Sequence, residues 1–270
     1  MAESDSDAAP STTIGTTPTT SPARTARERA REQITAEILE AARRHLATDG
    51  AAGLSLRAIA RELGFASSAV YRYVSSRDEL LTELLVGCYG DLGASVEAAA
   101  SGSAGEPPAR RWVTVACTIR DWAVAHPHEW ALLYGSPVPG YEAPERTVEP
   151  GIRASLALLG VVRDATRSGW RPNVAPTSDR SGPGGAAADD LELAQDLQRL
   201  GETLGLPDDL EPAALVGIVA AWTQTFGLVS FEVFGQTHGI AGSDEALFRA
   251  TATSTAAALG LDRAEQPRDP

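Results

Sequence analysis

Apolar residues recur every three or four positions through most of the chain, and this spacing is typical of helices that bury one face. In the first stripe, Ile38 and Leu46 are among the inward positions, and the stripe stops near Gly50. Thr25 and Glu28 precede it, three residues apart, which is the spacing of a helix-opening capping box. The pattern therefore predicts an α-helix as the first ordered element.

Shorter helical patterns follow directly. Ser55 is a suitable N-cap for a second helix, and Gly64 can end it by adopting a left-handed backbone conformation. A third helix is expected over Ser67–Val74. Ser76 and Glu79 repeat the capping-box spacing at the start of a leucine-rich fourth helix. Two short helices around a glycine turn predict a helix-turn-helix.

The remaining residues predict a larger helical bundle. Its helices are expected from Pro107 to His126-Pro127, in a short segment carrying Trp130 and Tyr134, and over Pro150–Gly169, Asp189–Leu204, Glu211–Phe234 and Ser243–Leu261. The predicted fold class is all-α, with an N-terminal three-helix helix-turn-helix domain followed by a larger helical-bundle regulatory domain. We expect these domains over 24–79 and 80–262, between tails at 1–23 and 263–270.

Some segments lack a helical pattern. The polar, low-complexity residues 1–23 are expected to be disordered, because they cannot bury enough apolar surface to offset the entropy of ordering. They have no apolar core segment and so are not a signal peptide. The Pro-, Ser- and Gly-rich residues 172–187 predict a flexible loop. No uninterrupted apolar run reaches about 18 residues, so a soluble, cytoplasmic protein without a membrane partner is expected.

Positive charge is concentrated near the N-terminus, although the net charge is −13. Residues 24–79 contain ten Arg and eight Asp or Glu, a local charge of +2, so the remainder carries −15. This balance excludes a protein that coats nucleic acid indiscriminately, but it permits a local basic patch. Cations oppose the dipole at a helix start, where four arginines stand: Arg24, Arg27, Arg29 and Arg31. Either nearby phosphates favour them, or the helix end is solvated with Glu28 and Glu32 as partners.

Four segments between Ile34 and Leu81 together resemble the TetR family of bacterial transcription regulators: ITAEI, LSLRAIARELGF, SSAVYRYV and SSRDELL. The resemblance implies that the third helix enters the major groove of DNA, while the Tyr-x-Tyr region and the fourth-helix start hold phosphates. It assigns Ser67, Ser68 and Arg72 to base contacts, Tyr71, Tyr73 and Arg77 to phosphates, and Arg57 to the flanking backbone or a base edge. For each tyrosine, the alternative is a core ring with only its hydroxyl exposed.

Ala66 departs from the family pattern, which usually has Ser or Thr as the cap of the third helix. An alanine cap costs about 1 kcal/mol relative to serine. Ser67 can take the cap instead, which would shift the helix start by one residue. Its assignment to a base contact depends on which residue is the cap.

A second resemblance covers HPHEWALLYGSPVPGYEAP and AWTQTFGLVSFEVFG, which are similar to the C-terminal ligand-binding and dimerisation domain of TetR-like regulators of the Trp-His-Gly type. This chain has Trp222, then Phe226-Gly227 in place of His-Gly, so the imidazole is absent there. The resemblance therefore implies a fold rather than a particular ligand.

A ligand site in this domain would be a mostly apolar pocket between helices with a few polar groups. The residues predicted around it are Trp122, Trp130, Tyr134, Trp222, Thr225, Phe226, Phe231 and Glu232. The alternative for each aromatic residue is a place in the core. Glu232 is a carboxylate within an apolar helix and needs a partner, either an Arg of the protein or a cationic ligand.

Signatures of enzymes and cofactors are absent from the sequence: there is no G-x-G-x-x-G, Walker or H-E-x-x-H motif. We expect no enzymatic activity, no cofactor and no metal site. His126 and His128 lie near Glu129 but straddle a proline and lack a third ligand, so a structural role is expected. The same role is expected for the other histidines, His45 and His238. Reduced core thiols are expected for both cysteines, Cys88 and Cys117.

The expected function is that of a DNA-binding transcriptional regulator, with repression implied by the family resemblance alone. It would hold a palindromic double-stranded operator as a homodimer and respond to a small-molecule effector of unknown identity. The helices over Glu211–Phe234 and Ser243–Leu261 are the expected interface, unless they complete a monomeric bundle. Two alternatives are a small-molecule-binding helical protein that has lost specific DNA recognition and an enzyme built on the bundle.

Overall fold

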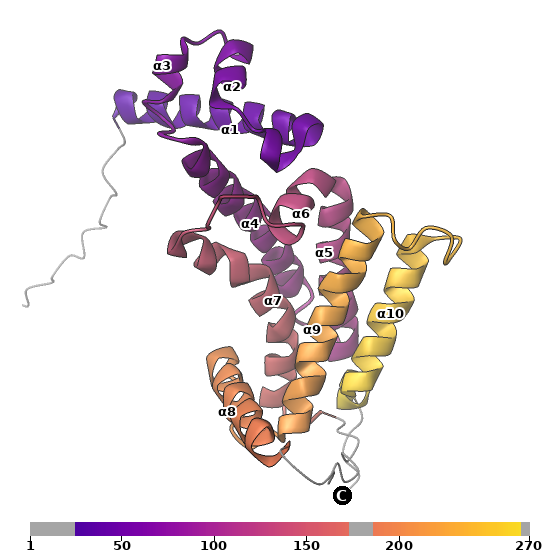
Figure 1. Cartoon of the computed structure of the whole chain (residues 1–270). Helices are drawn as coiled ribbons and strands as arrows, with labels where there is room; N and C mark the ends of the chain where they lie inside the picture. The colour runs from indigo at the N-terminus through magenta and orange to yellow at the C-terminus, as the bar shows by residue number, and fades with distance from the viewer. Residues whose placement is uncertain (1–24, 173–185, 266–270) are drawn as a thin grey trace, which may run out of the picture.

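The computed structural model describes residues 25–172 and 186–265, and Figure 1 shows a small helical head joined to a larger bundle. No strand occurs among those residues, and the all-α prediction is confirmed. The predicted tail 1–23 lies outside the described residues, as do 173–185 of the predicted loop and 266–270 of the second tail. Residues 186 and 187 belong to a helix.

The sequence-encoded caps define the head. It consists of α1 (Ala26–Gly53), α2 (Leu56–Glu62) and α3 (Ser67–Val70). Thr25 and Glu28 form the predicted capping box in both directions. Ser55 caps α2, because its side-chain oxygen accepts a hydrogen bond from the backbone N–H of Ala58, the third residue of the helix. Gly50 has a non-helical backbone, which breaks α1 one turn before its end, where the apolar stripe was predicted to stop.

Gly64 turns the chain from α2 toward α3. Its φ of +69° is a left-handed conformation that favours glycine. The N–H groups of Gly64 and Phe65 bond to the carbonyls of Arg61 and Ala60, which are the paired bonds of a Schellman motif. These bonds satisfy the end of α2 and fix the direction in which α3 leaves it.

The third helix is shorter than the predicted Ser67–Val74 segment, because α3 ends at Val70. The N–H groups of Arg72 and Tyr73 bond to carbonyls three residues back, so the backbone tightens into turns. Arg72 and Tyr73 therefore lie on a turn that follows the helix.

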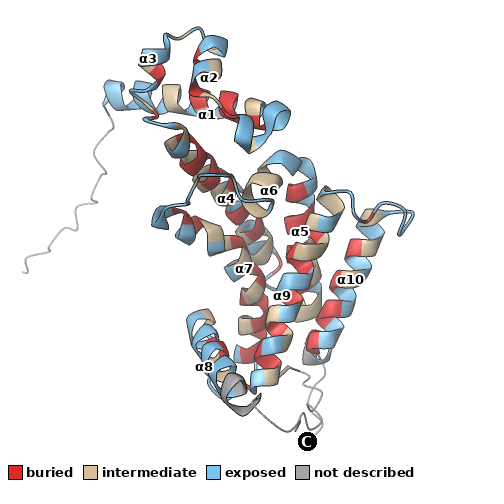
Figure 2. Ribbon diagram, in the orientation of Figure 1, coloured by how far each residue is buried: buried red, intermediate tan, exposed pale blue. Residues whose placement is uncertain are grey.

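The bundle contains the helices that the apolar spacing predicted, with ends shifted by a few residues. They are α4 (Arg77–Gly102), α5 (Pro108–Ala125), α6 (Pro127–Tyr134), η1 (Glu145–Thr147), α7 (Val148–Arg167), α8 (Ala186–Leu204), α9 (Pro212–Val233), α10 (Asp244–Leu259) and η2 (Leu261–Glu265). Figure 2 shows buried residues along α4 and α5, which lie inside the bundle.

Buried side chains form two cores. The N-terminal core gathers apolar residues of α1, α2, α3 and the start of α4, and the C-terminal core gathers those of the rest of the bundle. Helix α4 belongs to both, because Leu84 packs in the first core and Leu92 in the second. Helix α6 is also shared, since Leu132 packs on the N-terminal core and Trp130 in the C-terminal core. A displacement of either helix would disturb both cores.

Helix α9 is long and apolar enough to cross a membrane by length and composition, with a mean hydropathy of 1.6 over its most apolar stretch. A core helix of a soluble protein passes the same test. Here α9 packs against α5, α6, α7, α8 and α10. Only 39% of that stretch is buried, however, so much of its apolar surface faces outward.

Both cysteines are free, and they lie in helices as predicted. Cys88 is buried in the C-terminal core, while Cys117 is half-buried. Burial is the main cause that raises the pKa of the Cys88 thiol to about 11. This thiol therefore stays protonated, and weakly nucleophilic, near neutral pH.

Candidate DNA-binding interface and regulatory core

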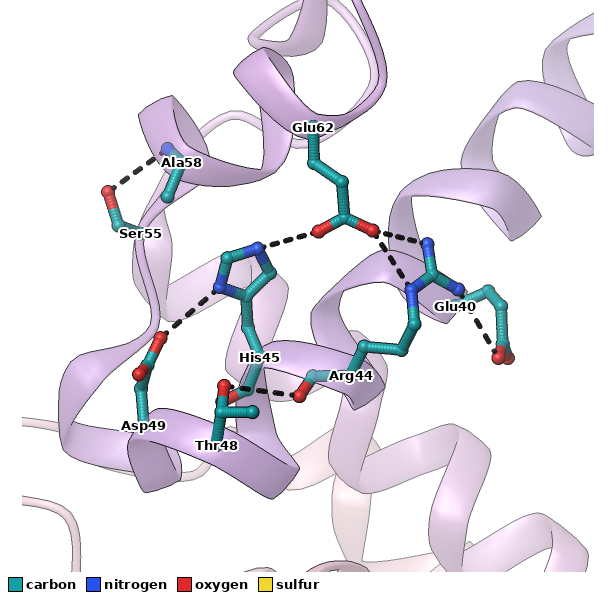
Figure 3. Close-up of polar contacts among 8 residues, drawn as sticks. All are labelled: Glu40, Arg44, His45, Thr48, Asp49, Ser55, Ala58 and Glu62. Carbon is teal, nitrogen blue, oxygen red and sulfur yellow. Dashed lines mark hydrogen bonds and ion pairs between the residues drawn. The ribbon is translucent and has the colours of Figure 1, made fainter.

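A polar network holds α2 against α1, as Figure 3 shows. Glu62 of α2 accepts hydrogen bonds from Arg44 Nε at 2.9 Å and Nη2 at 2.6 Å, and its other oxygen lies 2.8 Å from His45 Nε2. Asp49 lies 3.3 Å from His45 Nδ1. The Arg44 hydrogen bonds are the main reason that the pKa of Glu62 lies below its usual range. His45 thus has the structural role predicted, and the network fixes the platform that carries α3.

Ala66 is the N-cap of α3, and no side chain caps the helix. The N–H of Ala69 bonds to the carbonyl of Ala66, so Ser67 is the first helical residue. The alternative in which Ser67 takes the cap is wrong. Ser67 and Ser68 are instead both exposed on the single turn of α3, where their hydroxyls are open to solvent.

Exposed arginines precede and follow this turn along the chain. Within 25–172 and 186–265, no ion-pair partner is present for Arg57, Arg61 or Arg72. Tyr71, which is 46% exposed, adjoins Arg72. Two further exposed arginines without an ion pair to a described residue stand at the start of α1, Arg27 and Arg29.

Two other arginines of the head form ion pairs. Arg43 pairs with Asp91 at 3.0 Å, and Arg44 pairs with Glu62. The ion-paired guanidinium groups of the head therefore lie between helices, at the α1–α4 and α1–α2 contacts, whereas Arg57, Arg61 and Arg72 are exposed without an ion pair to a described residue. Such clustered positive charge is the electrostatic requirement for holding DNA phosphates.

Two predicted phosphate contacts occupy different surroundings from Tyr71. Tyr73 is half-buried against the N-terminal core, and the guanidinium carbon of Arg31 lies 5.8 Å from its ring centre. Arg77 turns inward, where its Nη2 donates to the carbonyl oxygens of Ala51 and Ala52 at 2.9 and 3.2 Å. Arg77 thereby closes the C-terminal end of α1, a role that the sequence analysis missed.

Replacing Arg77 with alanine should destabilise the head by about 1–3 kcal/mol, because two carbonyls would lose a charged donor. Urea unfolding of this variant should therefore shift to a lower midpoint. Arg72→Ala is the matched control, since Arg72 is exposed, and it should change stability by less than about 0.5 kcal/mol. A normal midpoint for Arg77→Ala together with weaker DNA binding would instead support the predicted phosphate contact.

Four of the eight residues predicted for a ligand site come together in the bundle, and Tyr89 of α4 joins them. This aromatic cluster consists of Tyr89, Trp130, Tyr134, Trp222 and Phe226. Ring centroids are 4.4 Å apart for Trp130 and Tyr134 and 5.3 Å apart for Tyr134 and Phe226. The cluster joins α4, α6 and α9 in the C-terminal core.

The polar groups of the cluster differ in how they are satisfied. The indole N–H of Trp130 donates to Ser230 Oγ at 3.1 Å, and that of Trp222 donates to Ser155 Oγ at 3.0 Å. The Tyr134 hydroxyl is buried without a hydrogen-bond partner among the described residues. Burial raises the pKa of this phenol, so it stays protonated. A buried hydroxyl without a hydrogen-bond partner is energetically unfavourable.

The structure does not bring three of the predicted ligand residues to the cluster. Trp122 stacks on His126 with ring centroids 4.7 Å apart. Thr225 is buried and donates to the Ala221 carbonyl of its own helix. Phe231 is 54% exposed.

Glu232, the eighth, has an arginine of the protein as its partner. Arg120 of α5 donates from Nε and Nη2 to the two carboxylate oxygens at 2.8 and 2.6 Å. Both side chains are only 10–11% exposed. The Glu232 hydrogen bonds are the main cause that raises the pKa of Arg120. Of the two partners that the sequence left open, the structure contains the arginine.

No group of three or more His, Cys, Asp or Glu side chains in the described part of the chain is placed to hold a metal ion. His126 Nδ1 lies 2.8 Å from the Trp122 carbonyl, at the junction of α5 and α6. That contact gives His126 a structural partner.

Two family models match the chain. One, described as "Bacterial regulatory proteins, tetR family", matches residues 38–84, and the other, "Tetracyclin repressor-like, C-terminal domain", matches residues 112–255. The chain belongs to the TetR family. This TetR-family chain is a DNA-binding transcriptional regulator, as the resemblance implied. The Trp-His-Gly subtype stays a prediction.

Curated relatives agree with this assignment. The HTH-type transcriptional regulators Mb1846 of Mycobacterium bovis and Rv1816 of Mycobacterium tuberculosis are each 43% identical over 211 residues, which cover 78% of this chain and 85% of each relative. The crystal structure of SCO4313, described as a regulatory protein, has a TM-score of 0.62 and 31% identity, covering 86% of this chain and 98% of that one. A Rhodococcus sp. RHA1 protein of unknown function, at 22% identity and a TM-score of 0.59, shares the fold over 84% of this chain and 95% of its own.

Proposed function

We propose that this TetR-family protein represses transcription in the cytoplasm by binding a palindromic operator as a homodimer, and that a small-molecule effector releases it. Three arginines carry the DNA-binding half of the proposal: Arg57, Arg61 and Arg72 are exposed around α3 without ion-pair partners among the described residues. In this account residues 24–79 hold the operator and residues 80–262 form the regulatory domain. Two recognition helices about 34–36 Å apart would enter successive major grooves.

The operator symmetry provides the first test. DNA fragments that the protein selects from genomic DNA should contain two inverted half-sites. The centres of these half-sites should be separated by about 10 base pairs, which is one turn of the DNA helix, or by a multiple of that distance. A duplex with one half-site scrambled should bind far more weakly than the intact duplex in a gel shift. Equal binding to both duplexes would refute the proposal that a dimer binds the two half-sites of one operator.

Exposed apolar residues of the bundle support dimerisation. Most of them lie on α7, α8 and α9 or directly after α9: Val148, Ile152, Leu156, Leu191, Leu193, Leu200, Val216, Phe231 and Phe234, while Val124 of α5 and Ile240 are exposed elsewhere. The outward positions of α10 carry small or polar residues, including Thr253 and Ser254. A second copy is the occupant that fits a surface of this kind. The proposed surface differs from the interface expected from sequence, because it combines α9 with α7 and α8 rather than with α10.

Light scattering should give twice the 28.2 kDa mass of one chain at micromolar concentration. The double variant Ile152→Glu/Val216→Glu should shift this mass toward the monomer, because two carboxylates per chain would be buried without partners. The matched variant Thr253→Glu on α10 should stay dimeric. A monomeric wild-type protein, or dissociation caused by the α10 change alone, would contradict this interface.

Effector response is assigned to the aromatic cluster and α6. Trp130 and Tyr134 of α6 lie in that cluster, whereas Leu132 of the same helix packs on the N-terminal core. A ligand that accommodates the Tyr134 hydroxyl would have to move rings that are in contact, and α6 would transmit the displacement to the head. If the ligand binds the displaced state better, DNA must weaken ligand binding by the same factor.

A specific observation favours a second candidate, a helical small-molecule-binding protein that has lost specific DNA recognition. Helix α3 is a single turn with an alanine cap, so little of it is held by its own hydrogen bonds. A gel shift without any specific complex, combined with effector binding, would favour this alternative. Catalysis has no assigned residues in this proposal.

A further inference from the structure

We infer that an open cleft at the end of the bundle farthest from the head binds a small organic anion, by a carboxylate or phosphate group. The cleft has a volume of about 1,060 Å³. It lies where α5 begins and where α7 and α10 end, and it shares no residue with the aromatic cluster. This volume is slightly above the range of small-molecule sites, roughly 300–1,000 Å³.

Arg111 provides the buried cation in this cleft. The residue is only 8% exposed, and its Nη2 donates to Asp164 at 2.9 Å. Its Nε is buried without a hydrogen-bond partner among the described residues. Arg163 also approaches Asp164, at 3.5 Å, so this carboxylate is shared between two guanidinium groups. One negative charge thus faces two positive charges, and a net positive charge is left beside the cleft.

Two further arginines line the cleft. Arg263 is exposed and forms no ion pair with a described residue, whereas Arg171 bonds to backbone carbonyls and Asp209. Three arginines and the two acids Glu106 and Asp164 give the lining a charge of +1 (3 − 2). The chain as a whole is −13, so a cationic cleft is a departure from its average surface.

Trp170, Pro108 and Ala165 provide an apolar part of the lining. Trp170 is held by a hydrogen bond from its indole N–H to the Gly260 carbonyl at 2.8 Å, which ties the end of α7 to the end of α10. Pro108 and Ala165 complete this side. Pro108 is also at the start of α5, where the helix dipole favours a negative group. An anion near Arg111 and Arg263 would thus have space for a small hydrophobic group beside it.

Titration calorimetry on the full-length protein, without DNA, tests the site with two probes, benzoate and inorganic phosphate. Arg263→Ala should weaken binding of the preferred probe by roughly tenfold, the loss expected for one charged hydrogen bond. Arg110→Ala is the matched control, because Arg110 is the exposed neighbour of Arg111 and does not line the cleft. It should leave the affinity unchanged.

Asp164→Asn is expected to increase the anion affinity, and a misfolded variant would not show such an increase. Removing the carboxylate that competes for Arg111 should increase anion affinity by about tenfold or less. No binding of either probe, an equal loss for Arg263→Ala and Arg110→Ala, or weaker binding by Asp164→Asn would overturn the site. Tighter binding of phosphate than of benzoate would overturn the apolar half of the inference. Because DNA is absent, these results do not depend on whether the operator proposal holds.

Discussion

Replacing Glu232 with alanine should lower the free energy of unfolding by about 3–5 kcal/mol, because it leaves the guanidinium of Arg120 buried without its bidentate partner. Among the described residues, Arg120 would retain Asp121 as its one acidic partner, and the side chain of Asp121 is 68% exposed. The loss should appear as a lower urea midpoint at fixed protein concentration, since the stability of the proposed dimer would depend on concentration.

Two control variants distinguish the effect of burying an unpaired charge from the effect of losing a carboxylate. Asp196→Ala removes a carboxylate from an exposed pair with Arg199 and should change stability by no more than about 1 kcal/mol. The double variant Arg120→Leu/Glu232→Met removes both buried charges and should recover much of the stability lost by Glu232→Ala. A small effect of Glu232→Ala would show that water or another group satisfies Arg120, and the buried pair would then not anchor α9 to α5.

Arg57→Ala and Arg72→Ala should each weaken operator binding with little change in stability, because both side chains are exposed without ion-pair partners in the described chain. A residue that reads a base should cost about 1–3 kcal/mol and relax preference at that position. A residue that holds a phosphate should reduce the salt slope by about 0.9 per contact, and a dimer loses two contacts at once. Fluorescence anisotropy on operator and random duplexes distinguishes the two roles.

Arg249→Ala is the charge-matched control. Arg249 is exposed on α10 and pairs with Glu245, far along the chain from the head. It should bind the operator with wild-type affinity. An equal loss for all three variants would mean that overall charge, rather than the exposed arginines around α3, controls the affinity.

Local signals in the sequence predicted the helices well. The caps at Thr25, Ser55 and Ser76 and the glycine turn at Gly64 all act within a few residues, so their effect is encoded in short segments. The predicted capping box at Ser76 is only half formed, because its established bond is the one from the Glu79 N–H to the Ser76 side chain. The Glu79 carboxylate instead lies 2.9 Å from Arg146 of η1, which is distant in sequence.

The sequence pattern did not predict contacts between residues that are distant along the chain. Glu232 was predicted to need a partner, but Arg120 is 112 residues away, and spacing along the chain does not reveal which helices pack together. The same reason hid the inward turn of Arg77 toward the end of α1. Helix α9 is apolar on several faces, so its periodicity did not show that Phe231 is exposed while Phe226 is buried.

The salt dependence of specific binding is the most direct test of the central claim that exposed arginines around α3 hold an operator. Anisotropy titrations of the selected operator and of a random duplex should be compared between about 50 and 200 mM salt. If the dimer makes roughly six to ten phosphate contacts, operator affinity should fall by about 10³–10⁵ over this range while staying above that for random DNA. Salt-independent binding, or equal affinity for both duplexes at every salt concentration, would contradict the account.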